Sequence, residues 1–218
     1  MARRRVAILI SGRGSNMSAL IDAATGTDYP AEIALVLSNR QNAAGLTTAS
    51  QHGITTACVD HREFESREEF EQALDTRLTE ANIELVCLAG FMRLLTSWFV
   101  ERWRDRLINI HPSILPAFKG LHTHERALEA GVRLHGCTVH FVRADMDSGP
   151  IIVQAAVAVG GDDTPDTLAA RVLEAEHRIY PYALNLIAGR AARVVGERVL
   201  LTGEGTPSPA MIWPSEES

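Results

Sequence analysis

Short apolar runs alternate with amphipathic segments through most of the chain. Five runs rich in aliphatic and β-branched residues predict strands at residues 5–11, 33–38, 55–59, 85–89 and 107–110. Runs that are apolar throughout, with helical segments between them, are typical of parallel strands buried on both faces. We therefore expect an α/β protein with a mostly parallel central sheet flanked by helices.

Capping residues mark the starts of two helices. Residues 66–69 (SREE) have the spacing of a capping box and predict an amphipathic helix to about Asn82. Thr164 followed by Pro165 is typical of an N-cap with proline in the first turn. We expect this second helix to reach Pro181, where the proline should end or kink it.

The alternation changes in the last third of the chain. Two strands, at 137–142 and 151–159, follow each other without a helix between them, which predicts antiparallel strands in the C-terminal part. Residues 192–202 predict a further hairpin, and residues 203–218, rich in Gly, Pro, Ser and Glu, predict a weakly ordered tail. A chain of this length fits one domain of about 150 residues or more, which we place at 1–202.

Composition narrows the class of protein. With 46% hydrophobic and 22% charged residues, the chain is ordinary for a globular protein. It contains no apolar run of about 18 residues, so we expect no membrane span. The apolar run after the basic start ends at Ser11, which favours the first strand of a cytoplasmic protein over a secretory leader. A net charge of −6 with scattered arginines argues against a nucleic-acid partner and leaves a small anionic ligand open.

Cysteine and histidine spacing favours neither a disulfide framework nor a metal site. Three cysteines stand singly in apolar surroundings, and we expect buried reduced thiols: Cys58, Cys87 and Cys137. Four histidines fall close together in the chain: His122, His124, His135 and His140. Their spacing lacks the H-E-x-x-H arrangement and any matching Cys or acidic ligand set, so we expect no metal.

The segment SGRGSN at residues 11–16 follows the first strand and precedes a helix. Backbone N–H groups and a helix N-terminus in that position can cradle an anion. A dinucleotide fingerprint needs glycine where Met17 stands, and a P-loop needs lysine after its last glycine. A single phosphomonoester on Gly14, Ser15 and Asn16 fits better, and a tight turn without a ligand stays open.

The segment INIHPSILP at 108–116 places Asn109 and His111 on one face of a strand, because residues i and i+2 point the same way. Pro112 disfavours helix at His111, which places the imidazole at the carboxyl end of the strand. Ligands bind at that edge in open α/β sheets. An amide and an imidazolium can donate to a developing oxyanion or pass a proton, so the pair suits attack on a carbonyl.

A catalytic histidine needs a group that fixes its tautomer and favours its charged form, and a carboxylate does both. The candidate is Asp147, in the segment DMDSGP at 145–150, between the two late strands. Asp145 competes with it on sequence grounds. From these residues alone, a strand-end role for His111 and a turn role for Asp147 stay open.

The loop GFMRLL at 90–95 follows the fourth strand, at the same edge of the predicted sheet. An apolar loop with a single arginine there can clasp a flat ligand with an acidic tail. A buried connecting loop is an equally valid interpretation.

Together these segments resemble the phosphoribosylglycinamide formyltransferase family of purine biosynthesis. The resemblance covers roughly residues 5–200, in order and at the expected spacing. It is carried by ISGRGSN at 10–16, AGFMRLL at 89–95, INIHPSILPAFKGLHTHERALEAG at 108–131, GCTVHFV at 136–142, DSGPII at 147–152 and EHRIYP at 176–181. It implies a Rossmann-like formyltransferase fold. It also implies transfer of a formyl group from 10-formyltetrahydrofolate, as co-substrate, to the amine of 5-phosphoribosylglycinamide without a metal.

The resemblance implies a role for each matched residue. The catalytic trio is Asn109, His111 and Asp147, in which Asn109 and protonated His111 stabilise a tetrahedral intermediate and Asp147 holds His111. The ribonucleotide set is Gly14, Ser15, Asn16, Leu173, Glu174, Ala175 and Glu176. The folate set is Arg67, Met92, Arg93, Leu94, Leu95, Asn109, Arg143, Ala144, Asp145, Met146 and Asp147.

Two positions depart from the family pattern. Arg13 stands where many relatives carry asparagine, and Leu173 stands where some carry lysine near the substrate. If the charge of that lysine matters, Arg13 or Arg171 is expected to replace it.

Three alternatives compete with the transferase. Formyltetrahydrofolate deformylase has a similar trio but usually an extra N-terminal regulatory domain, whereas the first strand here starts near residue 5. Methionyl-tRNA formyltransferase shares the fold but needs a C-terminal tRNA-binding extension and a basic surface. A non-catalytic folate or nucleotide module predicts that one residue of the trio is missing. We therefore expect small-molecule substrates, neither nucleic acid nor membrane, and a monomer or homodimer.

Overall fold

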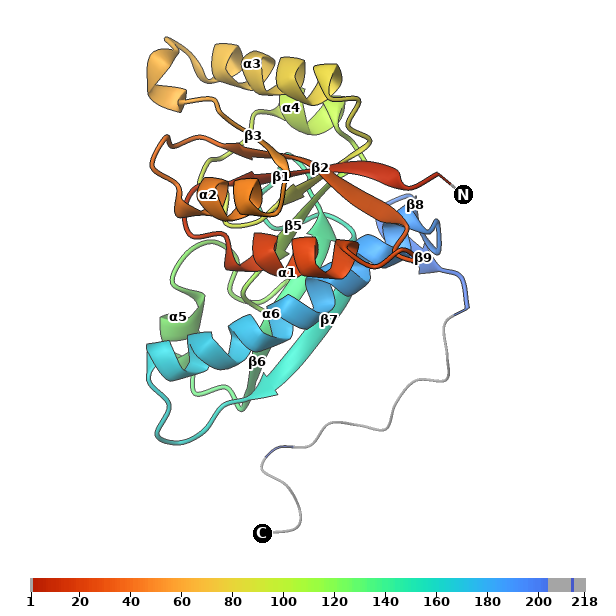
Figure 1. Ribbon diagram of the computed structural model, residues 1–218. Helices are drawn as coiled ribbons and strands as arrows, with labels where there is room; N and C mark the ends of the chain where they lie inside the picture. Colours follow the sequence, from red (N-terminus) through yellow and green to blue (C-terminus); the bar gives the residue numbers. More distant parts are fainter. Residues whose placement is uncertain (1, 204–212, 214–218) are drawn as a thin grey trace.

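A seven-stranded sheet forms the centre of the computed structural model, which describes residues 2–203 and residue 213 (Figure 1). Its strands are β1 (Arg4–Ile10), β2 (Ala31–Ser38), β3 (Thr55–Cys58), β4 (Leu85–Leu88), β5 (Leu107–His111), β6 (Leu134–Phe141) and β7 (Ile151–Ala158). They lie in the order β3-β2-β1-β4-β5-β6-β7. The first five are parallel, and β6 and β7 are antiparallel to their neighbours. The predicted mixed sheet is confirmed.

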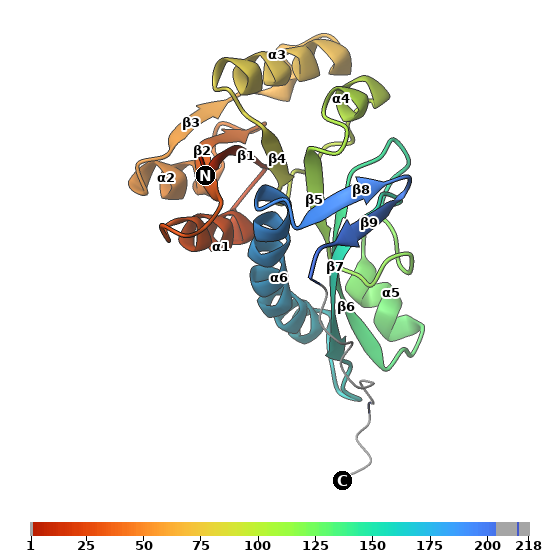
Figure 2. The same cartoon turned by 90° about the vertical axis from the view of Figure 1, so that its right-hand side faces the viewer.

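Helices cover both faces of this sheet. They are α1 (Ser15–Ala24), α2 (Ala44–Gln51), α3 (Arg67–Glu80), α4 (Ser97–Arg102), α5 (Thr123–Glu129) and α6 (Pro165–Ala188), with a 3₁₀ turn η1 (His61–Glu63). Figures 1 and 2 show α1, α2 and α6 on one face and α3 and α4 on the other. Strand β1 contributes side chains to both layers. Val6, Ile8 and Ile10 pack with α1 and α6. Ala7 and Leu9 pack with α3 and α4 on the other face. This double burial explains why the strand is apolar throughout.

The two predicted caps form, one of them with a shifted partner. Thr164 accepts a hydrogen bond from the Thr167 N–H at 3.2 Å, and the Thr167 hydroxyl accepts from the Thr164 N–H at 2.9 Å, which is a reciprocal capping box. Ser66 likewise accepts from the Glu69 N–H at 3.1 Å. The Glu69 carboxylate, however, accepts from the Glu65 N–H at 3.2 Å rather than from Ser66. The second half of the predicted box is therefore wrong by one residue.

Helix α6 does not end at Pro181, although proline removes one helical hydrogen bond. The helix continues to Ala188, and its buried side chains Tyr180, Leu184 and Ile187 lie on both sides of the proline. Burial of this apolar face outweighs the loss of one bond, because tertiary packing supplies most helical stability. An end at the proline is therefore wrong, and the expected alternative of a kink there stays a prediction.

Two of the three cysteines are buried as predicted. Burial raises the pKa of Cys87 and of Cys137 to about 12, so both thiols stay protonated and unreactive. The prediction is wrong for Cys58, which is exposed at the end of β3. Strand β3 is an edge strand and has no neighbour on one side that would cover this residue.

The remaining expectations concern the C-terminal part. The predicted hairpin is present as β8 (Ala192–Val195) and β9 (Arg198–Leu201). The expected tail at 203–218 lies outside the described residues except for Gly203 and Trp213. The domain boundary at residue 202 stays a prediction. Within the described part of the chain, no helix is long and apolar enough to cross a membrane.

A buried tyrosine joins helix α6 to the sheet. The Tyr180 hydroxyl donates to the carbonyl of Leu88 at 3.0 Å and lies 3.3 Å from the carbonyl of Ile108, so it links α6 to both β4 and β5. The side chain is fully buried. A buried hydroxyl that meets carbonyls of two neighbouring strands fixes the height of the helix above the sheet.

We predict that Tyr180→Phe lowers the free energy of unfolding by about 1 to 2 kcal/mol, because the buried carbonyls lose their donor. Thermal unfolding should shift down by roughly 2 to 8 °C. The matched control is Tyr182→Phe on the same helix, where the side chain is 56% exposed and little change is expected. Equal melting temperatures for both variants and the wild type would contradict the role of this hydroxyl.

Candidate active site

The chain reverses its direction of travel across the sheet between β1 and β4. From β1 it proceeds outward to β2 and β3, and it then returns to form β4 and β5 on the other side of β1. The carboxyl ends of two such strands leave a crevice, which is where open α/β sheets bind ligands. The predicted phosphate turn follows β1, the predicted folate loop follows β4, and His111 ends β5. The topology therefore brings these three features to one edge.

The structure brings the three predicted catalytic residues together. Ile108 and Ile110 pack into the layer of α6, so the alternating Asn109 and His111 face the other side of β5. There the loop after β6 returns, and Asp147 Oδ2 lies 3.4 Å from His111 Nδ1. The His111 side chain is only 7% exposed, so this contact is largely shielded from water.

Both ring nitrogens of His111 face oxygen acceptors. Nδ1 faces the carboxylate of Asp147, and Nε2 lies 3.1 Å from the carbonyl oxygen of Phe118. A carbonyl can only accept a hydrogen bond, and only the doubly protonated ring can donate to both partners. The two acceptors therefore fix the orientation of the ring.

His140 is a fourth member of the site whose orientation the sequence left open. It pairs with Asn109 across β5 and β6, and its Nε2 lies 3.4 Å from Asn109 Nδ2 and 3.9 Å from Asp147 Oδ1. Burial lowers the pKa of His140, so the ring is neutral. Its Nδ1 is 3.0 Å from the Phe141 carbonyl, which leaves Nε2 to accept from the Asn109 amide. The pairing of β5 with β6 is regular here, and His140 faces the site because its neighbours Val139 and Phe141 pack into the opposite layer.

The loop that carries Asp147 has one conformation that few residues can adopt. Asp147 has φ 51°, in the left-handed region that costs a non-glycine residue about 1 to 2 kcal/mol. At Gly149, a Cβ atom would lie 1.8 Å from the carbonyl oxygen of Phe141, so only glycine fits. The Gly120 N–H donates to Asp147 Oδ2 at 2.8 Å and holds the carboxylate in place. The competing Asp145 is exposed, and its carboxylate makes no contact with His111 in the described structure.

The predicted ribonucleotide residues meet from two distant segments. Gly14 has φ 76° and caps α1, whose first residues are Ser15 and Asn16. Asn16 Nδ2 donates to Glu176 Oε2 on α6 at 2.6 Å, and burial raises the pKa of Glu176. Asn16 Oδ1 is buried without a hydrogen-bond partner among the described residues. The other predicted members on α6 differ in exposure: Leu173 and Ala175 are half-buried, and Glu174 is exposed.

The two arginines that were expected to replace the missing lysine differ in whether their charge is available. Arg171 donates to both carboxylate oxygens of Asp163, at 2.7 and 2.9 Å, and to the Ala158 carbonyl at 2.8 Å. Its guanidinium is therefore occupied in holding the start of α6. Arg13 is exposed in the turn beside Gly14.

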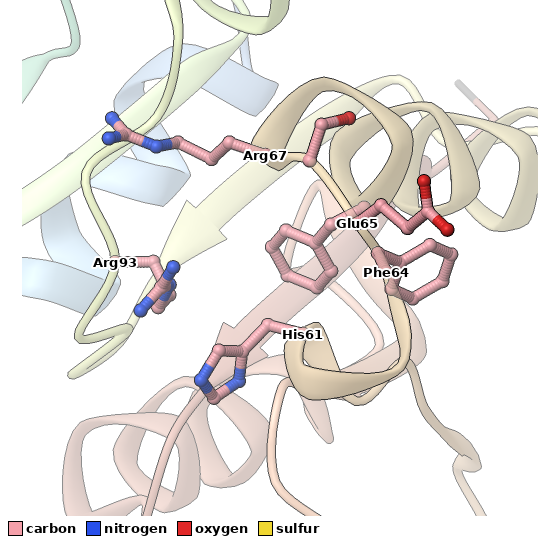
Figure 3. Close-up of a pocket in the computed structure, with 7 residues that line it drawn as sticks. His61, Phe64, Glu65, Arg67 and Arg93 are labelled. Carbon is pink, nitrogen blue, oxygen red and sulfur yellow. The ribbon is translucent and has the colours of Figure 1, made fainter.

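The loop after β4 exposes its apolar side chains. Met92 is 62% exposed and Leu94 65%, Arg93 is exposed and Leu95 half-buried. A pocket of about 220 Å³ adjoins the loop and is lined by His61, Phe64, Glu65, Ser66, Arg67, Phe70 and Arg93. Figure 3 shows Arg67 extending from the start of α3 toward the loop that carries Arg93. Two predicted folate residues that lie 26 positions apart in the sequence therefore share one pocket.

Within the loop between β6 and β7, Arg143 is paired with acidic residues, whereas the other predicted folate residues at 144–146 are exposed. The Arg143 guanidinium bonds to Asp105 at 2.8 Å and to Glu197 at 2.9 Å, so its charge is already paired. Ala144, Asp145 and Met146 are exposed. Because its guanidinium is paired, Arg143 can make the predicted folate contact only through its backbone. The exposed residues can contact a ligand with their side chains.

The clustered histidines do not form a metal site in the described part of the chain, where no group of three potential ligands converges. His124 and His135 instead meet edge to face, with ring centroids 5.3 Å apart. Burial, and next the neighbouring His124, lower the pKa of His135 from its ordinary 6.5 to about 4. Its ring is therefore neutral in the folded protein near pH 7.

We predict that stability falls as the pH drops from about 6.5 to 4. The unfolded chain protonates His135 below about pH 6.5 and the folded chain only below about pH 4, so acid favours the unfolded state by up to about 3 kcal/mol. Urea unfolding at several pH values measures this. His135→Gln should flatten the pH dependence, whereas a control at the exposed His52, His52→Gln, should not. An unchanged slope in His135→Gln would refute the assignment.

The chain is similar in sequence to known formyl transferases. The sequence profile of the formyl transferase family matches residues 4–184. The trifunctional purine biosynthetic protein adenosine-3 of Gallus gallus is 51% identical over 87% of this chain, which spans only 19% of that relative. The phosphoribosylglycinamide formyltransferase of Escherichia coli (strain K12) is 41% identical, and the match covers 93% of this chain and 95% of that protein.

Solved structures share the whole fold. Glycinamide ribonucleotide transformylase 1 from Symbiobacterium toebii superposes with a TM-score of 0.89 at 44% identity, over 91% of this chain and 94% of that one. A formyltetrahydrofolate deformylase from Burkholderia mallei superposes at 0.84 with 29% identity, over 92% of this chain and 70% of that one. The chain belongs to the formyl transferase family, in which it groups with the phosphoribosylglycinamide formyltransferases.

Proposed function

We propose that this formyltransferase moves the formyl group of 10-formyltetrahydrofolate to the amine of 5-phosphoribosylglycinamide, in de novo purine biosynthesis. The products are formyl-phosphoribosylglycinamide and tetrahydrofolate. The observation that carries the proposal is the contact of His111 with Asp147, 3.4 Å apart beside Asn109, at the edge of the sheet. An imidazolium and an amide at one point suit a carbonyl that becomes an oxyanion.

The reaction begins when the substrate amine attacks the formyl carbon and gives a tetrahedral intermediate. The Asn109 amide and the His111 Nε2–H donate to its anionic oxygen. Because Nε2 contacts the Phe118 carbonyl at 3.1 Å, the formyl oxygen takes the place of that acceptor. The intermediate collapses when a water molecule carries the proton from the attacking amine to the departing folate nitrogen. No covalent bond to the enzyme forms.

Asp147 acts on this reaction through His111. Its carboxylate favours the charged imidazolium and fixes the ring orientation, and it is itself held by the Gly120 N–H at 2.8 Å. His140 orients Asn109 in a similar way, since its Nε2 lies 3.4 Å from the amide nitrogen. The donors are thus oriented before the negative charge develops, which is the basis of electrostatic catalysis.

The ribonucleotide binds at the turn before α1 and at α6. Its phosphate accepts hydrogen bonds from the backbone of Gly14, Ser15 and Asn16, where the helix dipole also favours an anion. The buried and unpartnered Asn16 Oδ1 is available to a substrate donor. Residues 173–176 provide the second wall, and Arg13 adds the nearby positive charge.

The folate binds between two loops. Residues 92–95 and 143–147 hold its pterin ring, and the exposed Met92 and Leu94 supply apolar contact. The pocket with Arg67 and Arg93 accepts the acidic tail of the folate. The enzyme acts on small molecules, as a monomer or homodimer, in the cytoplasm. The three free cysteines agree with that reducing compartment.

We predict that Asp147→Asn lowers turnover by about two orders of magnitude or more while the fold stays intact. Asparagine still accepts the Gly120 N–H, but it brings no negative charge to His111, so the donor to the developing oxyanion is weakened. Steady-state rates, with circular dichroism as the folding check, measure the loss. Asp145→Asn is the comparison within the same loop, and its turnover should fall far less. Near wild-type turnover in Asp147→Asn would remove Asp147 from the mechanism.

The alternative function is hydrolysis of 10-formyltetrahydrofolate, with water in place of the amine. A spectroscopic assay of tetrahydrofolate release, run with and without 5-phosphoribosylglycinamide, separates the two. We expect release to depend on the ribonucleotide, because only its amine is positioned to attack. Equally fast release without it would overturn the transferase in favour of the deformylase.

A further inference from the structure

The segment Met92–Leu95 combines exposed side chains with a fixed backbone. Met92 and Leu94 are more than half exposed, although large apolar side chains gain free energy from burial. Loops with such side chains can collapse onto the protein surface unless their ends are held. Two buried polar groups outside the segment hold its two ends here.

Ser11 holds the first end. This residue follows β1, is 6% exposed, and accepts a hydrogen bond from the Met92 N–H at 2.8 Å. Its hydroxyl donates in turn to Asn39 Oδ1 at 2.6 Å, and Asn39 is also buried. Phe91 adds a packing contact at the same end, because its ring stacks on Phe70 at a centroid distance of 6.5 Å. Strand ends β1, β2 and β4 are thereby joined at the start of the loop.

Glu71 holds the second end. This fully buried residue of α3 accepts from the Thr96 N–H at 2.7 Å through Oε1 and from the Thr96 hydroxyl through Oε2. Thr96 is the N-cap of α4, and its hydroxyl also accepts from the Phe99 N–H at 3.4 Å. Burial raises the pKa of Glu71, because the apolar layer of α3 and α4 disfavours the charged carboxylate.

Resting on the proposed function, we propose that Ser11 and Glu71 are positioning residues for the folate site. They touch neither substrate nor reacting atoms. They fix the backbone of Met92–Leu95 so that its apolar side chains and Arg93 present a preformed wall to the folate. A preformed wall lowers the entropy cost of binding, so loss of either group weakens folate binding and leaves the ribonucleotide site intact.

The Glu71 position offers a test that separates positioning from stability. Glu71→Gln can still accept the Thr96 N–H through its carbonyl and can donate to the Thr96 hydroxyl, so it should behave as the wild type. Glu71→Met has a similar shape and removes both bonds along with the buried carboxyl group. We expect it to raise the KM for 10-formyltetrahydrofolate about fivefold, the factor for one ordinary hydrogen bond. Its melting temperature should fall by only a few degrees, since removal of the buried carboxyl offsets part of the two lost hydrogen bonds, so the KM is measured on folded protein.

Ser11→Ala tests the other end with Ser38→Ala as its matched control. Ser38 is equally buried at the end of the neighbouring β2, and its hydroxyl bonds only to the backbone of Arg40 among the described residues. Ser11→Ala should raise the folate KM about fivefold, with the ribonucleotide KM unchanged. Ser38→Ala should change neither constant, although both variants lose a buried hydrogen bond.

Calorimetric titration with tetrahydrofolate keeps the test independent of catalysis. We expect its Kd to rise by the same factor in Ser11→Ala and Glu71→Met and to stay at the wild-type value in Glu71→Gln and Ser38→Ala. Wild-type affinity in Ser11→Ala and Glu71→Met would overturn the positioning role, even with the transferase activity established. If the wild type binds tetrahydrofolate but transfers no formyl group, the proposed function fails while this comparison still decides the roles of Ser11 and Glu71. A wild type that binds no tetrahydrofolate would overturn both.

Discussion

Burial of β1 on both faces is the constraint on which the rest of this structure depends. Residues 6–10 are completely buried between the layer of α1 and α6 and the layer of α3 and α4. No side chain within the strand can therefore carry chemistry. Polar function is displaced to the carboxyl end, where the backbone leaves the core at Ser11 and the glycine turn begins. Because β4 lies beside β1, the loop at residues 90–95 begins at the same edge, and the Ser11 hydroxyl bonds both to Asn39, just after β2, and to the Met92 N–H.

The antiparallel end of the sheet adds what a purely parallel sheet lacks. Strand β6 runs back along β5, so His140 lies opposite Asn109, and the loop after β6 starts near Leu107. That loop then returns over the face of β5 that carries Asn109 and His111 and brings Asp147 to His111. Because β6 is antiparallel, its following loop begins at the amino end of β5 and has to run back along this strand. Asp147 therefore meets His111, which lies 36 positions earlier in the sequence, only after that return.

Local patterns in the sequence predicted the elements and the strand-end position of Asn109 and His111, the family resemblance implied the proposed catalytic trio, and long-range contacts limited the rest. Period-two spacing and Pro112 were sufficient to place Asn109 and His111 at a strand end. The position of His140 beside Asn109 depends on the pairing of β6 with β5, and the exposure of Cys58 depends on which strand lies at the edge. The ion pairs of Arg143 and Arg171 join segments that no motif connects. These features arise from tertiary packing, which outweighs local preference in the same way at Pro181.

The loop after His111 combines a fixed base with a strained tip, and the two halves have different tasks. At the base, the buried Thr138 hydroxyl donates to the Ser113 carbonyl at 2.7 Å and accepts from the Leu115 N–H at 3.0 Å. At the tip, Phe118 and His122 have φ 51° and 56°, in the left-handed region that disfavours both residues. The carbonyl of Phe118 contacts His111 Nε2, the donor that the proposed mechanism assigns to the formyl oxygen. Because a strained tip is easier to displace than a hydrogen-bonded base, the proposed transfer requires no movement of the strand that carries His111.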